Sequence, residues 1–392
     1  MSGAPEIQGS CDARFEGVRE AFAENFRSRR EVGAAVAVVV EGRPVVDLWA
    51  GHADMAGTRP WQRDTLANVY STTKAMTALC AQRLVDEGRL DLDATVASIW
   101  PEFAAAGKAR IPVRWLLSHR AAIPAVREPL AGEALYDWDA MAEALAAEEP
   151  WWEPGARHGY HAITFGWLVG EVVRRLAGES LGSFFRKTFA APLDLDFHIG
   201  LPEREHVRAA EMSGLAAPAP EELAGAEEVV ALVRLMLTEP QGMTARAFNN
   251  PPSLAAGPNG AAWRSAEIPA ANGHGTARSL ARIYGALARD DGSLLSHEGL
   301  ARCHHEESAG PDAVLQVSTR FSTGFMLSQG QPDTSFGPNR RAFGHPGAGG
   351  SVGFADLDAE VGFGYVMNRM GPRILLDPRA VALIGSVYEA LG

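Results

Sequence analysis

The chain has 392 residues, of which 46% are hydrophobic and 21% are charged, so it can bury a large core and has the composition of a globular protein. Its net charge of −12 argues against nucleic acid or an anionic membrane as a partner. No apolar run of about 18 residues predicts a membrane span, and residues 1–20 contain no apolar signal segment, so we expect a cytoplasmic protein. The three cysteines form no disulfide framework.

The first predicted elements are a helix and a hairpin. Aromatic and aliphatic residues at helical spacing predict a helix over residues 14–29. Two Val-rich runs, 34–40 and 45–50, are separated by a turn containing Gly and Pro, which is typical of a β-hairpin. A second helix is expected from Thr72 to a stop at Gly88.

The middle of the chain has the apolar periodicity of helices, interrupted by loops rich in Pro, Asn and Ala. Helices are predicted over 111–119, 137–147, 165–176, 180–189, 229–237 and 277–288. The two main loops are predicted over 216–220 and 249–258.

The C-terminal end returns to strands. Strands are predicted over 343–347, 351–357 and 361–367, with a turn between the last two. Asp377 followed by Pro378 is typical of a helix start, and the apolar spacing continues this helix to the end of the chain.

Together these elements predict an α+β fold. Because both ends of the chain supply hairpins and a helix, we expect one antiparallel sheet flanked by the N- and C-terminal helices. The sheet region would comprise residues 1–78 and 335–392, and a mostly helical region would comprise residues 79–334. The active site is expected at the junction of the two regions.

The motif Ser71-Thr72-Thr73-Lys74 opens the second predicted helix. Residues three apart lie on one face of a helix, so Ser71 and Lys74 would point the same way. A hydroxyl is a poor nucleophile until a base takes its proton, and burial can lower the pKa of a Lys enough for that task. The start of a helix also favours a developing oxyanion. A capping Ser and a solvated Lys would explain the same residues, so the motif needs support from elsewhere.

Further motifs follow in a fixed order. Residues 152–160 read W-E-P-G-A-R-H-G-Y, residues 343–350 read F-G-H-P-G-A-G-G, and residues 116–119 read L-L-S-H. Residues 273–275, G-H-G, look like a turn before a later helix. With Ser-x-x-Lys just after the first hairpin, this order resembles the serine β-lactamase and penicillin-binding-protein fold, and most closely its class C branch and the family VIII carboxylesterases. The resemblance covers almost the whole chain and implies a β-lactamase/DD-peptidase-like fold.

The resemblance also implies roles for individual residues. Ser71 would be the nucleophile, and Lys74 and Tyr160 would share the work of general base and acid as a coupled pair, in an order that the sequence leaves open. The oxyanion hole would be formed by the backbone amides of Ser71 and Ala348. Glycines around Ala348 permit the close backbone approach that this requires.

The sequence departs from the β-lactamase pattern at two places. The Asn of the family's Tyr-x-Asn motif is replaced by Ala162, and Lys-Thr-Gly reads His345-Pro346-Gly347. The Lys and hydroxyl that hold a substrate carboxylate are therefore missing, and His345 is at best partly charged near neutral pH. We accordingly expect esters without a free carboxylate as substrates. The candidate pocket residues are His345, Gly347, His161 and Trp152.

Two other stretches suggest competing sites. Residues 349–353, G-G-S-V-G, match the nucleophile elbow of α/β-hydrolases, but a strand rather than a helix is predicted after Ser351 and little chain remains for an acid and a His. The run Cys303-His304-His305 with two following Glu residues has metal-ligand residue types. Adjacent side chains diverge and no second ligand cluster accompanies the run, so a solvated segment is predicted instead.

The sequence thus predicts a serine hydrolase that cleaves short-chain carboxylic esters through a Ser71 acyl-enzyme, without metal or cofactor. A β-lactamase or D-Ala-D-Ala peptidase using the same site is the alternative within the fold. The sequence also leaves room for an acyltransferase and for a non-catalytic β-lactamase-like binding protein. The expected partner is a small-molecule ester, and the sequence leaves the oligomeric state open.

Overall fold

A nine-stranded antiparallel sheet organises the computed structural model, which describes residues 5–214, 226–252 and 257–392. The expected loop at 216–220 lies outside the described residues, as does the 253–256 part of the expected loop at 249–258. The strand order is β1-β3-β2-β12-β11-β10-β9-β8-β7. The strands are β1 (Gln8–Cys11), β2 (Gly33–Val40), β3 (Arg43–Gly51), β7 (Ser308–Pro311), β8 (Ser318–Phe321), β9 (Met326–Leu327), β10 (Phe343–Pro346), β11 (Val352–Asp356) and β12 (Val361–Met367).

The two ends of the chain meet in the middle of this sheet. Strand β2 pairs with β12 so that Val40 lies opposite Val361 and Ala34 opposite Met367. Strands β2 and β3 form the predicted hairpin, and β10, β11 and β12 form the predicted C-terminal meander. The expected antiparallel sheet built from both termini is therefore confirmed.

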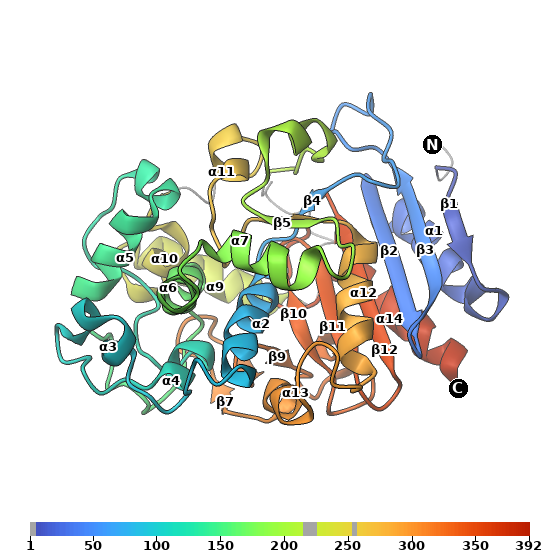
Figure 1. The fold of residues 1–392 in the computed structure, drawn as a ribbon. Coiled ribbons are helices and arrows are strands. Elements are labelled where there is room, and N and C mark those ends of the chain that lie inside the picture. Colours follow the sequence, from blue (N-terminus) through green and yellow to red (C-terminus); the bar gives the residue numbers. More distant parts are fainter. Residues whose placement is uncertain (1–4, 215–225, 253–256) are drawn as a thin grey trace.

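Helices cover both faces of the sheet (Figure 1). Helix α12 (Ala277–Ala288) packs on β2, β11 and β12, and α1 (Glu16–Ser28) packs on α14 (Pro378–Leu391). The contact of α12 with the sheet is very close, because a Cβ at Gly362 would lie 2.0 Å from the backbone nitrogen of Gly285. Bare backbone on both sides allows this approach.

The second part of the molecule is built around helix α2 (Thr73–Asp86), whose side chains are buried on nearly every face. It packs on α6 (Thr164–Ala177) and lies beside β10, as Figure 1 shows. The other α-helices among the described residues are α3 (Val96–Ile99), α4 (Val113–Leu117), α5 (Trp138–Ala147), α7 (Leu181–Phe185), α9 (Glu227–Thr238), α10 (Met243–Asn249), α11 (Ala261–Ser265) and α13 (His297–His304). A small sheet orders β4 (Ala67–Asn68), β6 (Gly273–Gly275) and β5 (Phe197–Ile199).

The predicted helices of the middle region are confirmed by α4 to α7, α9 and α12. In α5, Asp137 caps the first turn by accepting a hydrogen bond from the amide of Ala140. In α14, Asp377 accepts a hydrogen bond from the amide of Arg379, and Pro378 is the first helical residue, as the sequence predicts.

Several elements differ from the sequence prediction. Strands β7, β8 and β9 lie between residues 308 and 327, so the sheet takes in chain that was predicted as part of the mostly helical region 79–334. Strand β1 was not predicted, and the G-H-G motif at 273–275 is strand β6 rather than a turn. Strands β1, β6 and β7 are short and rich in Ser, Gly or Pro, which have weak strand propensity, so tertiary pairing rather than local sequence sets their conformation.

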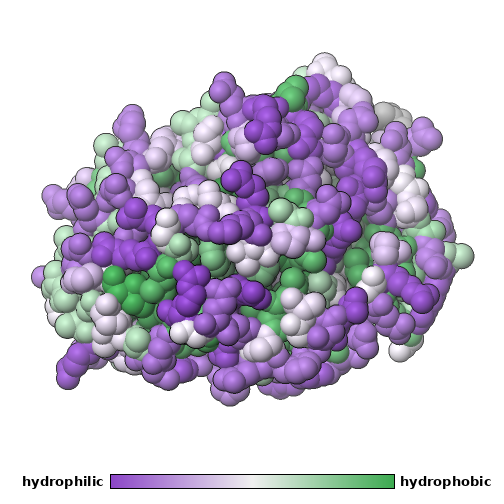
Figure 2. Space-filling view, viewed as in Figure 1, coloured by the Kyte–Doolittle hydropathy of each residue, from purple (hydrophilic) through white to green (hydrophobic). Residues whose placement is uncertain are grey.

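The face of the molecule drawn in Figure 2 is mainly hydrophilic, and its hydrophobic areas are interrupted by polar residues. Within the described part of the chain, no helix is both long and apolar enough to cross a membrane.

Candidate active site

The backbone in front of Ser71 is held in a strained conformation. Tyr70, the residue before it, has a φ of 43°, which is uncommon for a residue with a side chain. The hydroxyl of Thr73 donates to the carbonyl oxygen of Tyr70 (2.6 Å) and accepts from the amide of Gly273 (2.8 Å). The amide of Val69 donates to the carbonyl oxygen of Gly273 (2.8 Å). These bonds fix the half-buried Ser71 at the N-terminal end of α2.

Lys74 is fully buried one helical turn after Ser71. Its Nζ lies 3.0 Å from Oγ of Ser71, 2.7 Å from the carbonyl oxygen of Ala162 and 3.0 Å from that of Ala270. No carboxylate of a described residue forms an ion pair with it. Burial therefore lowers the pKa of Lys74 well below its usual value, since the charged form is poorly solvated there.

Tyr160 lies next to this pair. The Nζ atom of Lys74 lies 4.7 Å from the centre of the Tyr160 ring. Burial raises the pKa of the Tyr160 phenol, and a side-chain hydrogen bond with Ser71 opposes that rise. Ser71, Lys74 and Tyr160, which the sequence motifs singled out, are thus within contact of one another.

Asp312 is a residue of this site that the sequence analysis did not single out. Its carboxylate is buried and accepts hydrogen bonds from the amides of Tyr160 (3.0 Å), Val314 (2.8 Å) and Leu315 (2.8 Å), so it anchors the backbone that carries the Tyr160 ring. A single Asp in the stretch G-P-D-A gives no sequence signal for such a contact, because its partners are set by the fold.

Two buried histidines also hold the Tyr160 segment. The ring of His161 donates from Nδ1 to the carbonyl oxygen of Gly159 (2.7 Å), and its Nε2 accepts from the amide of Ile123 (3.1 Å). Neither nitrogen of His161 is left for a substrate, and burial lowers its pKa to about 3. The amide of His161 donates to Nδ1 of His119 (3.1 Å), whose ring lies 5.0 Å from that of Tyr160.

The glycine-rich loop after β10 approaches the Ser71 segment closely. A Cβ at Gly347 would lie 2.1 Å from the carbonyl oxygen of Val69, so only Gly fits at this position. Its neighbour Ala348 is exposed, unlike the rest of the loop. Within the described residues, neither the amide of Ser71 nor that of Ala348 donates a hydrogen bond to protein. Two open backbone donors are what an oxyanion hole requires.

Ser351 follows this loop and is buried. Its hydroxyl donates to the carbonyl oxygen of Val69 (2.8 Å) and lies 3.2 Å from the hydroxyl of Thr72. The strand β11 follows it, whereas a nucleophile elbow requires a helix at that point. Ser351 therefore ties β11 to the segment in front of Ser71.

His345 is buried in β10, with its ring 5.9 Å from that of Tyr160. Its Nδ1 donates to the carbonyl oxygen of Pro346 (2.6 Å), and its Nε2 has no hydrogen-bond partner among the described residues. Burial lowers the pKa of His345 to about 3. The imidazole is therefore neutral, and position 345 carries no positive charge.

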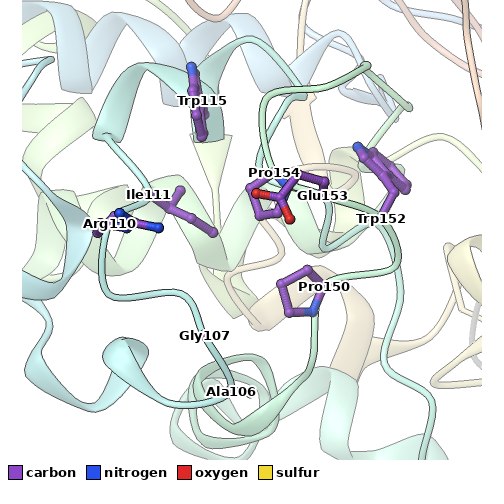
Figure 3. Close-up of a pocket in the computed structure, with 9 residues that line it drawn as sticks. All are labelled: Ala106, Gly107, Arg110, Ile111, Trp115, Pro150, Trp152, Glu153 and Pro154. Atoms are coloured by element: carbon purple, nitrogen blue, oxygen red, sulfur yellow. The ribbon is translucent and has the colours of Figure 1, made fainter.

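Trp152 lines a separate hollow. Figure 3 shows its ring near Glu153 and Pro154, across from Arg110 and Trp115, and the hollow has a volume of about 530 Å³. None of Ser71, Lys74 and Tyr160 lines it. The indole nitrogen of Trp152 donates to the carbonyl oxygen of Arg157 (3.1 Å), so this side chain shapes the loop that leads to Tyr160.

The run of metal-ligand residue types near Cys303 lies at the end of α13. The Cys303 thiol is buried and donates to the carbonyl oxygen of Gly299 (3.3 Å). No group of three or more side chains able to hold a metal ion occurs among the described residues.

An antiparallel sheet from both termini, a helical region beside it and a Ser-x-x-Lys helix between them are the features of the serine β-lactamase and penicillin-binding-protein fold. The profile of the Beta-lactamase family matches residues 18–386, and the chain belongs to this family.

Solved structures and curated relatives agree with this assignment. A family VIII carboxylesterase is 44% identical, has a TM-score of 0.89 and aligns over 98% of this chain and 100% of its own. A penicillin-binding-protein homologue from Caulobacter crescentus is 40% identical with a TM-score of 0.87, over 98% of this chain and 100% of its own. The esterase/β-lactamase LipL of Mycobacterium tuberculosis is 39% identical over 95% of this chain and 85% of its own length. The predicted family and fold are confirmed.

Proposed function

We propose that the chain is a serine ester hydrolase in which Ser71 is the nucleophile and neutral Lys74 is its general base. The observation that carries the assignment is the set of partners around Nζ of Lys74. A neutral amine has two N–H donors and one lone pair. When burial keeps Lys74 neutral, the carbonyl oxygens of Ala162 and Ala270 accept its two N–H groups, and its lone pair faces the Ser71 hydroxyl 3.0 Å away.

The proposed reaction uses each group once per half-reaction. Lys74 takes the proton of Ser71 as its Oγ attacks the ester carbonyl, and the amides of Ser71 and Ala348 stabilise the oxyanion. Tyr160, kept as a neutral phenol by burial, donates its proton to the leaving alkoxide and is reprotonated from Lys74. Water then attacks the acyl-enzyme, and Tyr160 and Lys74 transfer protons in the opposite direction. Ser71 regains its proton, and the carboxylic acid is released.

The proposed substrates are short-chain carboxylic esters that lack a free carboxylate. A neutral His345 and the Pro346 ring supply neither the charge nor the hydroxyl that holds a carboxylate, and Ala162 has no side-chain amide. The names of the carboxylesterase and LipL relatives support ester hydrolysis. The name of LipL also includes β-lactamase, so a slow β-lactam hydrolysis at the same site is the second candidate.

We further propose that the site lies at the junction of the sheet and the helical region.

We also propose that the enzyme acts in the cytoplasm on a small-molecule ester. The free thiols Cys11, Cys80 and Cys303 support a reducing compartment. Fractionation of cells that express the tagged protein tests this location.

The esterase hypothesis predicts a substrate ratio. Wild-type enzyme should turn over p-nitrophenyl butyrate with a kcat/KM on the order of 100-fold or more above that for nitrocefin. The carboxylate of nitrocefin has no charged partner at position 345, and the loss of one charged contact costs a few kcal/mol of transition-state binding. Parallel steady-state assays measure the ratio. Faster turnover of nitrocefin would assign a β-lactamase, and turnover of neither substrate would indicate a binding protein. Ester exchange with added alcohol, monitored in the same assay, would identify an acyltransferase.

The pH profile should follow Lys74. Lys74 becomes protonated and can no longer act as a base when the pH falls below its lowered pKa. The value of kcat/KM should therefore rise with pH and reach its plateau at a pH well below ~10.4, the usual pKa of a Lys. Assays of p-nitrophenyl butyrate between about pH 5 and 10 measure the limb. The pKa of Lys108 is lowered by burial to about 8, so the Lys108→Met variant is the control and should leave the limb unchanged. A profile that still rises steeply near pH ~10 would contradict a neutral Lys74.

A further inference from the structure

Arg379 is buried behind the glycine-rich loop that carries Ala348. Its Nη2 donates to the carbonyl oxygen of Gly349 (2.7 Å), which also accepts from the amide of Gly371 (2.9 Å). Its Nη1 donates to the carbonyl oxygen of Arg369 (3.0 Å). One guanidinium therefore connects the loop after β10 to the segment that leads into α14.

Two buried carboxylates hold this guanidinium in place. Nε and Nη2 of Arg379 donate to Asp377 at 2.8 Å and 3.1 Å, and Nη1 donates to Glu31 at 2.9 Å. The hydroxyl of Tyr365 donates to the other oxygen of Glu31. All five N–H groups of the guanidinium are thus used, four of them on Nη1 and Nη2. The planar fork leaves Arg379 a single orientation.

The stability of the fold does not explain this arrangement. Burying an ion cluster costs desolvation that its attraction barely repays, and apolar residues of similar volume are often as stable. The arrangement instead directs one charged N–H to a loop with little conformational preference of its own. Gly349 has a φ of +87° and Gly350 a φ of +129°, a region that glycine enters without preferring it. The Gly349 carbonyl oxygen that Arg379 holds lies two peptide units after the Ala348 amide, so this bond limits the positions that the loop, and with it the Ala348 amide, can take.

We propose that Arg379, held by Glu31 and Asp377, is a positioning residue that fixes the loop 347–350 so that the Ala348 amide points at the oxyanion. Arg379 does not touch the substrate and acts through the carbonyl oxygen of Gly349. This inference rests on the proposed function, because it assumes that Ala348 supplies the oxyanion hole.

The test compares Arg379→Met, Arg379→Lys and Asp377→Asn with the control Tyr365→Phe. The control removes a hydrogen bond to Glu31 in the same buried cluster but leaves the bond from Arg379 to Gly349 intact. Folding of each variant is verified by circular dichroism at the assay temperature. We measure kcat and KM for p-nitrophenyl butyrate and Ki for phenylboronic acid, whose boron adds the Ser71 oxygen to form a tetrahedral anion.

Misplacing one oxyanion donor costs up to about 10²-fold in rate. We expect kcat to fall by roughly 10- to 100-fold in both Arg379 variants and less in Asp377→Asn, with KM changed by less than about 3-fold. The Ki of phenylboronic acid should rise in parallel with the loss of kcat, and Tyr365→Phe should keep kcat and Ki within about 3-fold of wild type. If the cluster only stabilised the fold, all four variants would unfold at a lower temperature and would keep the wild-type kcat and Ki.

Unchanged kcat and Ki in Arg379→Lys would overturn the positioning role, and so would equal losses in Arg379→Lys and Tyr365→Phe. If Arg379→Met does not fold, Arg379→Lys and Asp377→Asn decide the result, because both keep the cluster charged or hydrogen-bonded. Failure of the proposed function is separate: activity that survives in Ser71→Ala would remove the oxyanion hole assignment, whatever the Arg379 variants do.

Discussion

Ser71→Ala should lower kcat for p-nitrophenyl butyrate by on the order of 10⁴- to 10⁶-fold, because removing the nucleophile of a serine hydrolase abolishes the acyl-enzyme route. The fold should survive, since the Ser71 side chain is half-buried and the hydrogen bonds that shape its segment come from Thr73, Ser351 and the backbone. A burst of p-nitrophenol in the wild-type enzyme, absent in the variant, would show the acyl-enzyme directly. Steady-state rates and rapid-mixing traces provide the two measurements.

Ser351→Ala is the matched control for this prediction. It removes a hydroxyl from the same neighbourhood, and the carbonyl oxygen of Val69 loses one donor. We expect it to keep kcat within about 10-fold of wild type and to lower the free energy of unfolding by about 1–2 kcal/mol. Activity that is retained in Ser71→Ala and lost in Ser351→Ala would reverse the assignment in favour of the nucleophile elbow.

Lys74→Met should lower kcat by on the order of 10³- to 10⁴-fold, since it removes the general base but leaves the nucleophile and the oxyanion donors in place. Met has nearly the length of Lys and fills the buried space without a polar atom. The carbonyl oxygens of Ala162 and Ala270 lose their donor, so we also expect a loss of unfolding free energy of about 1–3 kcal/mol for each group left without a partner. Thermal unfolding and steady-state kinetics measure both effects.

The variant Lys108→Met separates the effect of a lost buried Lys on stability from its effect on catalysis. Lys108 is also buried, and its Nζ donates to the carbonyl oxygens of Ala105, Ala146 and Glu148, with no hydrogen bond to the Ser71 hydroxyl. The substitution should cost comparable stability and leave kcat unchanged. Equal kinetic losses in the two variants would mean that Lys74 acts through the fold rather than as the base.

The parts of the fold that could be predicted from the sequence are those with a strong local pattern. The Val-rich hairpin 34–50 and the strands 343–367 alternate or run apolar long enough to define a buried sheet, and they form β2, β3 and β10 to β12. Strands β7 to β9 could not be predicted, because β7 consists of Ser, Ala, Gly and Pro, β8 has only four residues and β9 only two. Pairing within the sheet makes them strands.

The candidate site shows the same division. The order of the motifs predicted Ser71, Lys74, Tyr160 and Ala348 as site residues. The substitutions above test the roles of Ser71 and Lys74 directly, and the roles of Tyr160 and Ala348 stay predictions. The environment of these residues could not be predicted. Nothing in the sequence indicates that two carbonyl oxygens rather than a carboxylate surround Lys74. Glu31 and Arg379 are 348 positions apart, so their contact exists only in the folded chain.

The pairing of β2 with β12 has a consequence for synthesis. Val40 leaves the ribosome long before its partner Val361, and at roughly 5–20 residues per second the N-terminal hairpin waits on the order of tens of seconds for it. Throughout this time the edge of β2 is an open template to which the same segment of a neighbouring nascent chain can add. Translation speed and chaperone supply therefore affect how much active protein a cell obtains, in addition to the stability of the finished enzyme.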